Sequence, residues 1–132
     1  MTLIDASLWI DFTRSKSPPN LKQFVTPHIL DSSAHLAEPV WFEILRYATD
    51  QEARKLTQFF ENYPILSTPT DLWLQAANLG RSCRQAGHTA GPLDLLIASV
   101  ALAHQALLIT FDQDFEKIAT VSSLRVKLLK RP

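Results

Sequence analysis

Two aspartates follow apolar segments that have the composition of buried β-strands. Asp5 comes directly after the segment Leu3–Ile4, and Asp112 comes after Leu107–Thr110 with one residue, Phe111, between them. Ligands of open α/β sheets bind outside the carboxyl ends of the strands. We therefore expect both carboxylates at one edge of a sheet, where they could act on the same ligand.

Two further acids are expected at this edge because each lies near the start of a helix. Pro92 opens a strongly apolar helix whose first turn contains Asp94. Pro39 suits the first turn of another helix, and Glu43 lies in its early part. If both helices pack conventionally, Asp94 and Glu43 face the two aspartates, so that four carboxylates converge.

A converging group of carboxylates needs a cation. Neighbouring negative charges push each other toward protonation, and burial adds to the cost of ionisation. Ligands that are all oxygen atoms suit Mg²⁺ or Mn²⁺, which leave coordination positions for phosphate oxygens. Zinc is disfavoured because the lone Cys83 and the four scattered histidines form no recognisable ligand spacing. The sequence thus predicts a magnesium or manganese site.

Each acid also has an interpretation in terms of stability alone. Asp94 could favour the positive end of its helix, which contributes about 0.3–1 kcal/mol. Asp112 or Asp114 could cap the short helix that follows them, and Glu43 could be a solvated charge on an amphipathic helix. Asp5 is the hardest to explain in this way, because a carboxylate that ends an apolar strand is seldom placed there for stability.

The elements that must position these acids alternate between strands and helices. Strands are expected at 3–4, 34–36, 65–66, 107–110 and 124–128. Helices are expected at 6–12, 39–48, 51–63, 72–83 and 93–106, and a last short helix follows a turn at residue 112 and ends at residue 119. The prolines of Ser15–Asn20 predict a loop, and Gly87 is the expected end of a helix. This alternation predicts an α/β fold, a three-layer α/β/α sandwich around a mainly parallel sheet.

Length and composition agree with this fold class. A chain of 132 residues suits one core, so we expect a single domain over residues 1–132. Hydrophobic residues make up 46% and charged residues 20%, which excludes disordered and fibrous classes. Lys plus Arg and Asp plus Glu number 13 each, so the net charge is +0 and any contact with nucleic acid must come from a local basic patch.

Location is predicted from what the sequence contains. One cysteine allows no internal disulfide, which favours a reducing compartment. The first twelve residues carry two aspartates and no basic segment, unlike a signal peptide, and no apolar run is long enough to span a bilayer. We expect a cytoplasmic protein without a membrane partner.

Four segments carry the acids in order along the chain: LIDASLWIDF, EPVWFEILRYA, PLDLLIASVAL and LLITFDQDFEKIA. Over nearly the whole chain, their order and spacing resemble the PIN-domain family, in particular the VapC-like toxins of bacterial type II toxin–antitoxin modules. Ala6 stands where the family often has Thr or Ser, and Tyr47 stands where a Gly is frequent. Neither departure touches an acid.

The resemblance implies a role for each residue of these segments. The catalytic metal ligands that it implies are Asp5, Glu43, Asp94 and Asp112. It makes Asp114 an alternative or helper to Asp112, and Glu38 a possible outer acid. Ser7 and Thr110 could donate hydrogen bonds that orient the ligating acids, although they could equally be ordinary strand-end hydroxyls.

The activity implied by the resemblance is metal-dependent hydrolysis of phosphodiester bonds in a structured RNA, whether transfer, ribosomal or messenger RNA. One or two Mg²⁺ or Mn²⁺ ions would activate water, so no side-chain nucleophile is needed. The family commonly forms homodimers and is silenced by a small antitoxin, and both partners are expected here.

Basic and aromatic residues are the candidates for contacts with RNA and with protein partners. Arg14, Lys16 and Arg46 are predicted to contact phosphates, and Lys130–Arg131 forms a basic tail, although each could simply be a solvated charge. The large aromatic residues are expected in the core or at an interface rather than as base-stacking platforms; they include Trp9, Trp41, Trp73 and Phe42.

Three other functions were weighed against the ribonuclease toxin. A non-catalytic PIN-like module that binds RNA or protein and a housekeeping RNA-processing nuclease would have the same fold. A phosphorelay receiver also has an acidic sheet edge that binds Mg²⁺. It is disfavoured because Asp5 has no acidic neighbour and Thr110 stands where a receiver has lysine.

Overall fold

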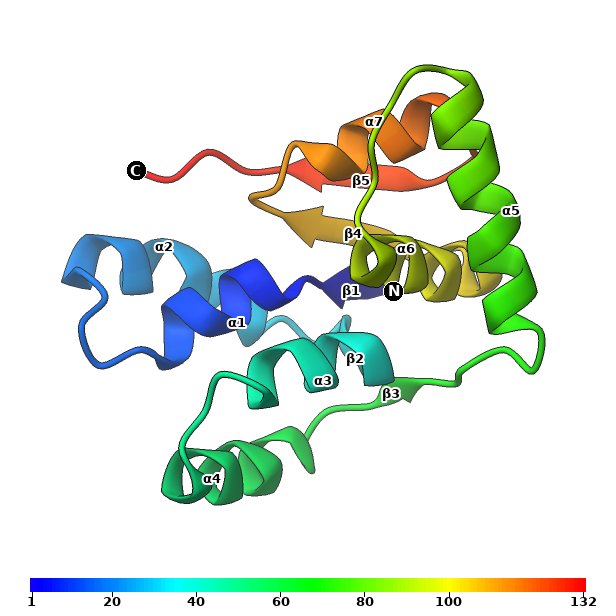
Figure 1. Ribbon diagram of the computed structural model, residues 1–132. Helices are drawn as coiled ribbons and strands as arrows, with labels where there is room; N and C mark the ends of the chain where they lie inside the picture. The colour runs from blue at the N-terminus through cyan, green and yellow to red at the C-terminus, as the bar shows by residue number, and fades with distance from the viewer.

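A computed structural model describes all residues from Met1 to Pro132 and contains one five-stranded sheet (Figure 1). The strands are β1 (Thr2–Ile4), β2 (Ala34–Ala37), β3 (Ile65–Leu66), β4 (Leu107–Thr110) and β5 (Arg125–Leu128). Their order in the sheet is β3-β2-β1-β4-β5, and every neighbouring pair is parallel. All carboxyl ends therefore lie at one edge, and the sheet is entirely rather than mainly parallel.

Seven helices connect the strands. They are α1 (Ala6–Thr13), α2 (Pro19–Ile29), α3 (Glu38–Leu45), α4 (Asp50–Phe60), α5 (Leu72–Gln85), α6 (Pro92–His104) and α7 (Asp114–Thr120). From β1 the chain moves outward to β2 and then to β3 at one side of the sheet. It then crosses back to β4 and β5 on the other side of β1, so right-handed crossovers place helices on both faces of the sheet. The expected three-layer α/β/α fold is confirmed. None of the helices combines the length and the apolar character that a bilayer crossing requires.

The helix α2 was not predicted from the sequence, which indicated a loop over Ser15–Asn20 and no element between that loop and the strand at residue 34. The helix begins at Pro19, and Pro18 precedes it with extended backbone. Proline is favoured at the first helical position, because its fixed φ suits the helix and its missing N–H group would have no partner there. Only Val25 and Ile29 are buried, so the helix has no long apolar stripe that would reveal it.

The end of α5 agrees with the prediction from Gly87. This residue has a φ of 81° and donates its N–H to the carbonyl of Arg84 over 3.0 Å. The N–H of His88 reaches the carbonyl of Cys83 over 2.9 Å. A left-handed glycine just beyond the last turn closes a helix in this way, because glycine adopts positive φ without steric cost.

An aromatic cluster fixes the position of α1. Trp9 is fully buried, and its ring lies edge-on at 5.3 Å from Phe60 and at 5.0 Å from Tyr63. These contacts join α1 to the end of α4, and edge-to-face pairs of this kind stabilise a core beyond the area they bury. The start of α1, which follows Asp5, is therefore held in place.

The other large aromatic residues do not all lie in the core. Trp41 is half-buried, whereas Trp73 is 74% exposed and Phe42 is 59% exposed. For these last two residues the core alternative is wrong. Trp73 lies in the first turn of α5 and Phe42 on the outer side of α3, where neither faces the sheet. Aromatic type alone did not distinguish them from Trp9, because burial depends on the side of the helix that packs.

Candidate metal centre

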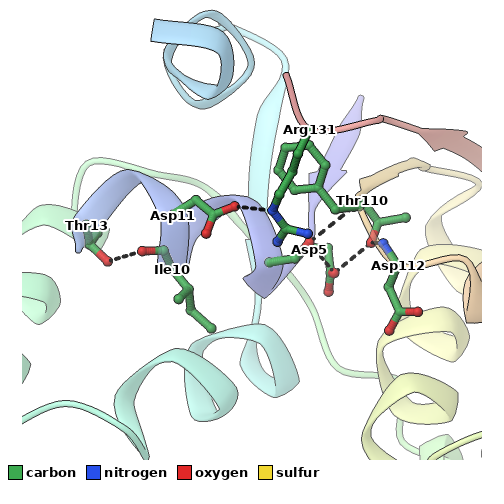
Figure 2. Close-up of polar contacts among 9 residues, drawn as sticks. Asp5, Ile10, Asp11, Thr13, Thr110, Asp112 and Arg131 are labelled. Carbon is green, nitrogen blue, oxygen red and sulfur yellow. Dashed lines mark hydrogen bonds and ion pairs between the residues drawn. The ribbon is translucent and has the colours of Figure 1, made fainter. Parts of the chain in front are cut away.

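Asp5 lies at the point where β1 passes into α1. The residues before it, Leu3 and Ile4, are fully buried, and the Asp5 N–H donates to the carbonyl of Ile109 in β4 over 2.9 Å. Asp5 holds the N-cap position of α1, but its side chain makes no capping hydrogen bond. The carboxylate, only 4% exposed, is turned instead toward the end of β4 (Figure 2).

Two hydroxyl groups hold this carboxylate. Thr110 Oγ1 and Ser7 Oγ both donate to Asp5 Oδ2, over 2.7 and 2.8 Å. Each hydroxyl oxygen also accepts a backbone N–H, Thr110 from Asp112 over 2.9 Å and Ser7 from Phe111 over 3.2 Å. Because these N–H groups occupy the acceptor side of the hydroxyls, the hydroxyl protons are directed at Asp5. The arrangement links the ends of β1 and β4 and fixes one carboxylate oxygen.

Three other aspartates approach each other beside this pair of strands. Asp94, Asp112 and Asp114 each offer a carboxylate oxygen, and these oxygens all lie within 4.8 Å of one another. Asp112 Oδ1 accepts the backbone N–H of Asp114 over 2.9 Å, so the capping interpretation of Asp112 also has a structural basis. Asp114 begins α7 and pairs with Lys117 Nζ at 3.2 Å.

The pKa of Asp94 responds to four other acids. Burial is the largest cause, and together with the negative charges of Asp112, Asp5, Glu43 and Asp114 it raises the pKa of Asp94 to about 7. The helix N-terminus that Asp94 occupies would lower the pKa of a carboxyl group, so the raised pKa means that burial and the neighbouring charges together outweigh the helix dipole. Stability of α6 alone does not account for Asp94.

Glu43 reaches the same site from α3. Its neighbours Val40 and Ile44 are buried and fix the side of the helix that packs on the sheet. Burial raises the pKa of Glu43, the charges of Asp5 and Asp112 raise it further, and Arg46 opposes them. Burial likewise raises the pKa of Asp5, against the hydrogen bonds from its two hydroxyl partners. Raised pKa values of neighbouring acids are the pattern expected where a cation would otherwise balance their charge.

Several residues named from the sequence lie outside the cluster of carboxylates, although Arg46 is close enough for its charge to lower the pKa of Glu43. Glu38 is exposed and accepts a hydrogen bond from Thr68 Oγ1 over 2.6 Å, so it bonds to none of the clustered acids. Arg46 stacks on the ring of Tyr47, with Cζ 4.6 Å from the centroid. Arg14 and Lys16 are exposed, just beyond the end of α1.

One ion pair near the site was not anticipated. Arg131 Nε donates to Asp11 Oδ2 over 2.9 Å, and Arg131 Cζ lies 4.3 Å above the ring centre of Phe111 (Figure 2). The sequence identified Arg131 only as part of a basic tail. A signal was present in Asp11, a charged residue among the apolar positions of α1, but its partner lies 120 positions away.

The donor set fits a hard divalent cation. All candidate ligands are carboxylate oxygens at the carboxyl edge of the sheet, and neither cysteine nor histidine is among the clustered side chains. Mg²⁺ and Mn²⁺ prefer such oxygen ligands. Asp5, Glu43, Asp94 and Asp112 could hold one, with Asp114 beside Asp112.

Comparison with known proteins places this geometry among relatives. The PIN domain family model matches residues 2–121. Ribonuclease VapC11 of Mycobacterium tuberculosis is 31% identical over 130 residues, which cover 95% of this chain and 96% of that protein. Ribonuclease VapC17 of the same species is 28% identical over 122 residues, covering 90% and 87% of the two chains.

A solved structure shares the fold over the full length. The chain in the crystal structure of VapBC2 from Rickettsia felis, bound to a DNA fragment from the promoter, superposes with a TM-score of 0.75. The match covers 98% of each chain at 19% sequence identity. The order of strands and helices is therefore retained in chains of widely different sequence.

Proposed function

The chain belongs to the PIN domain family, and from that premise we propose that it is a metal-dependent endoribonuclease, the toxin of a toxin–antitoxin pair. The observation that carries this proposal is the gathering of carboxylates at one sheet edge, where burial and the charges of four other acids raise the pKa of Asp94 to about 7. The relatives named as VapC ribonucleases support the reaction class.

We propose that the metal ligands are Asp5, Glu43, Asp94 and Asp112, with Asp114 as an additional or alternative ligand, and that the ion is Mg²⁺ or Mn²⁺. When bound, such an ion supplies a Lewis acid that activates water and stabilises negative charge on the attacked phosphate. The protein needs no nucleophile of its own for this hydrolysis.

The residues of the chain position the ligands and manage their protons. Ser7 and Thr110 direct their hydroxyl protons at Asp5 Oδ2, which fixes the orientation of that carboxylate. Near neutral pH and without a cation, the Asp94 carboxyl group is protonated about half of the time, since its pKa is about 7. A cation held by Asp94 would therefore displace its proton, so that affinity for the metal would rise with pH.

The proposed partners follow from the same assignment. Solved structures with this fold include a toxin–antitoxin complex from Klebsiella pneumoniae and a member of the VapBC family of toxin–antitoxin systems from Mycobacterium tuberculosis, which supports a small antitoxin as partner. The exposed Trp73 and Leu74 on α5 are consistent with the proposed homodimer. We also propose that residues 1–132 form a single domain. The proposed location is the cytoplasm, which is supported by a sole cysteine, Cys83, that is free and buried.

The direct test is cleavage of total bacterial RNA by the partner-free protein in Mg²⁺, in Mn²⁺ and with chelator, with the new RNA ends mapped by sequencing. Discrete cuts are expected in either metal and none with chelator or with Asp94→Asn. The matched control is Asp50→Asn, which removes an exposed aspartate from the first turn of α4 and should cleave normally.

Absence of cleavage from folded protein that binds Mn²⁺ would contradict the ribonuclease assignment and favour a binding module. Cleavage that persists with chelator would contradict the metal dependence.

A further inference from the structure

The C-terminal tail runs along the edge of the sheet that holds the acids. Beyond β5, the N–H of Leu129 donates to the carbonyl of Thr110 over 2.8 Å, which extends the pairing of β4 with β5. In Figure 1 the tail continues past the carboxyl ends of the strands. Lys130 and Arg131 are thereby brought beside Phe111, the residue between Thr110 and Asp112.

Arg131 is held in one orientation by two contacts. Its Nε donates to Asp11 Oδ2 over 2.9 Å, and its Cζ lies 4.3 Å above the centre of the Phe111 ring. Asp11 is buried, so this hydrogen bond is shielded from water on one side. The two terminal nitrogens of the guanidinium make no hydrogen bond within the protein, and the side chain is 52% exposed.

A hollow of about 350 Å³ lies beside this arginine. Its lining residues are Phe111, Gln113, Leu128, Leu129, Lys130 and Arg131. Phe111 and Gln113 precede and follow Asp112 in the chain, so the hollow lies at the end of β4, although no acid of the cluster lines it. Figure 2 shows the Arg131 guanidinium between Asp11 and the end of β4, on the side of the site where Thr110 holds Asp5.

The chemistry of this arrangement fits an anion. An acidic centre repels a polyanionic strand, and a bound divalent ion neutralises only part of five carboxylates. A guanidinium with Nε occupied presents its two terminal nitrogens as a pair, which matches two oxygens of a phosphate. The contacts of Arg131 with the Phe111 ring and with the Asp11 carboxylate hold these two nitrogens in place before a ligand binds, so little conformational entropy is lost on binding.

We propose that the hollow is a subsite for a backbone phosphate of the RNA strand next to the cleaved bond, with Arg131 as the phosphate ligand and Asp11 as the residue that orients it. Lys130 adds a second positive charge at the rim. The inference rests on the proposed ribonuclease function, because that function supplies the RNA.

The test measures binding of fluorescein-labelled transfer RNA by anisotropy, with every variant made in the uncleaving Asp94→Asn protein. Arg131→Ala should weaken binding roughly tenfold, in line with the loss of a charge-assisted hydrogen-bond pair, and should lower the salt slope by about 1. Arg131→Lys keeps the charge but not the paired nitrogens and should recover only part of the affinity.

Two further variants separate phosphate binding from a role in holding the tail. Arg125→Ala removes the same charge from β5, the strand before the tail, but Arg125 pairs with Leu107 at the opposite edge of the sheet, so transfer RNA binding should not change. Asp11→Asn keeps an acceptor for Arg131 Nε and removes a negative charge, so binding should be equal or a few-fold tighter. Thermal unfolding of each variant establishes that it is folded.

If Arg131 only fastens the tail, Arg131→Ala and Asp11→Asn will both lower thermal stability while the affinity and salt slope stay at their starting values, and the inference is overturned. The inference is also overturned if neither the Asp94→Asn protein nor any variant made in it binds transfer RNA. Cleavage assays on the Asp94 forms of the protein distinguish the two proposals. If the protein with Asp94 cleaves RNA and Arg131→Ala leaves binding unchanged, only the subsite proposal is wrong. If Arg131→Ala weakens binding but the protein with Asp94 cleaves no RNA, the ribonuclease proposal is wrong and the RNA subsite stands.

Discussion

Replacing Asp94 with asparagine removes a charge that burial and four neighbouring acids disfavour. The asparagine side chain keeps the size and shape of the aspartate side chain but cannot ionise. Without divalent cations, the wild-type protein must either protonate Asp94 or hold its charge among four other acids. We expect Asp94→Asn to be more stable than the wild type at pH 8 without metal, and to lose both stabilisation by Mn²⁺ and RNA cleavage.

The size of the effect follows from the pKa of Asp94. A rise from 3.8 to about 7 corresponds to at most about 4 kcal/mol, at about 1.4 kcal/mol for each pKa unit. Screening by solvent at this partly exposed group reduces the figure to about 1–2 kcal/mol. Loss of the favourable helix-dipole interaction costs roughly 0.5 kcal/mol. A net gain of about 0.5–1.5 kcal/mol raises Tm by roughly 2–5 °C for a domain of this size.

The pH dependence has a definite sign. The folded-state pKa of Asp94 is raised, so the wild type is penalised only where the unfolded chain has already released this proton. The stability difference between Asp94→Asn and the wild type should therefore be small near pH 4, should grow as pH rises from about 3.8 to about 7, and should be constant above.

The assay is thermal unfolding of both proteins across this pH range, with chelator and with excess Mn²⁺. At a concentration of Mn²⁺ about 100 times its Kd, the wild type should gain about 2.7 kcal/mol and the variant far less. Asp50→Asn is the control, because it removes an exposed acid from the first turn of α4 and should slightly destabilise the protein at every pH above the acid range. Lower stability of Asp94→Asn at pH 8, or a difference independent of pH, would refute the electrostatic reasoning.

Three further predictions test the site and the backbone. Thr110→Val removes a fully buried hydroxyl that donates a hydrogen bond to Asp5, so urea unfolding should show that the free energy of unfolding falls by about 1–3 kcal/mol. Thr110→Ser keeps a hydroxyl and should lose much less. Equal stability of Thr110→Val and the wild type would show that the hydrogen bond contributes nothing. Glu43→Gln removes one of the charges that raise the pKa of Asp94, so a carboxyl NMR titration without divalent ions should place that pKa below its wild-type value, and an unchanged titration would contradict the assigned proximity. Gln105 has a φ of 53°, so Gln105→Gly should raise the unfolding free energy by about 0.5–1 kcal/mol, and a loss of stability would contradict the inferred backbone strain.

Much of the fold could be predicted from local patterns. The buried strand β4 coincides with its predicted bounds of Leu107 to Thr110, and α6 begins at Pro92 as predicted. These elements carry strong signals because their residues are nearly all apolar or stand at a helix start. The helix α2 was lost because it buries few residues and because its opening prolines were interpreted only as breakers. Proline stops a helix from continuing but also favours its first position.

For the candidate site, the amino-acid sequence was enough to identify the carboxylates and to place Asp5 and Asp112 after strands and Asp94 at a helix start. Glu43 was expected in the early part of its helix, but it lies in the second half of α3, which ends at Leu45. A parallel sheet then requires strand-end acids to share an edge, so the gathering of Asp5 and Asp112 was predictable. The tertiary structure alone decided which residues touch. The order β2-β1-β4 brings Thr110 to Asp5, and the path of the tail brings Arg131 to Asp11. Pairs separated by more than a hundred residues leave no periodic signal in a single sequence, since their contact depends on strand order and chain path rather than on local preference.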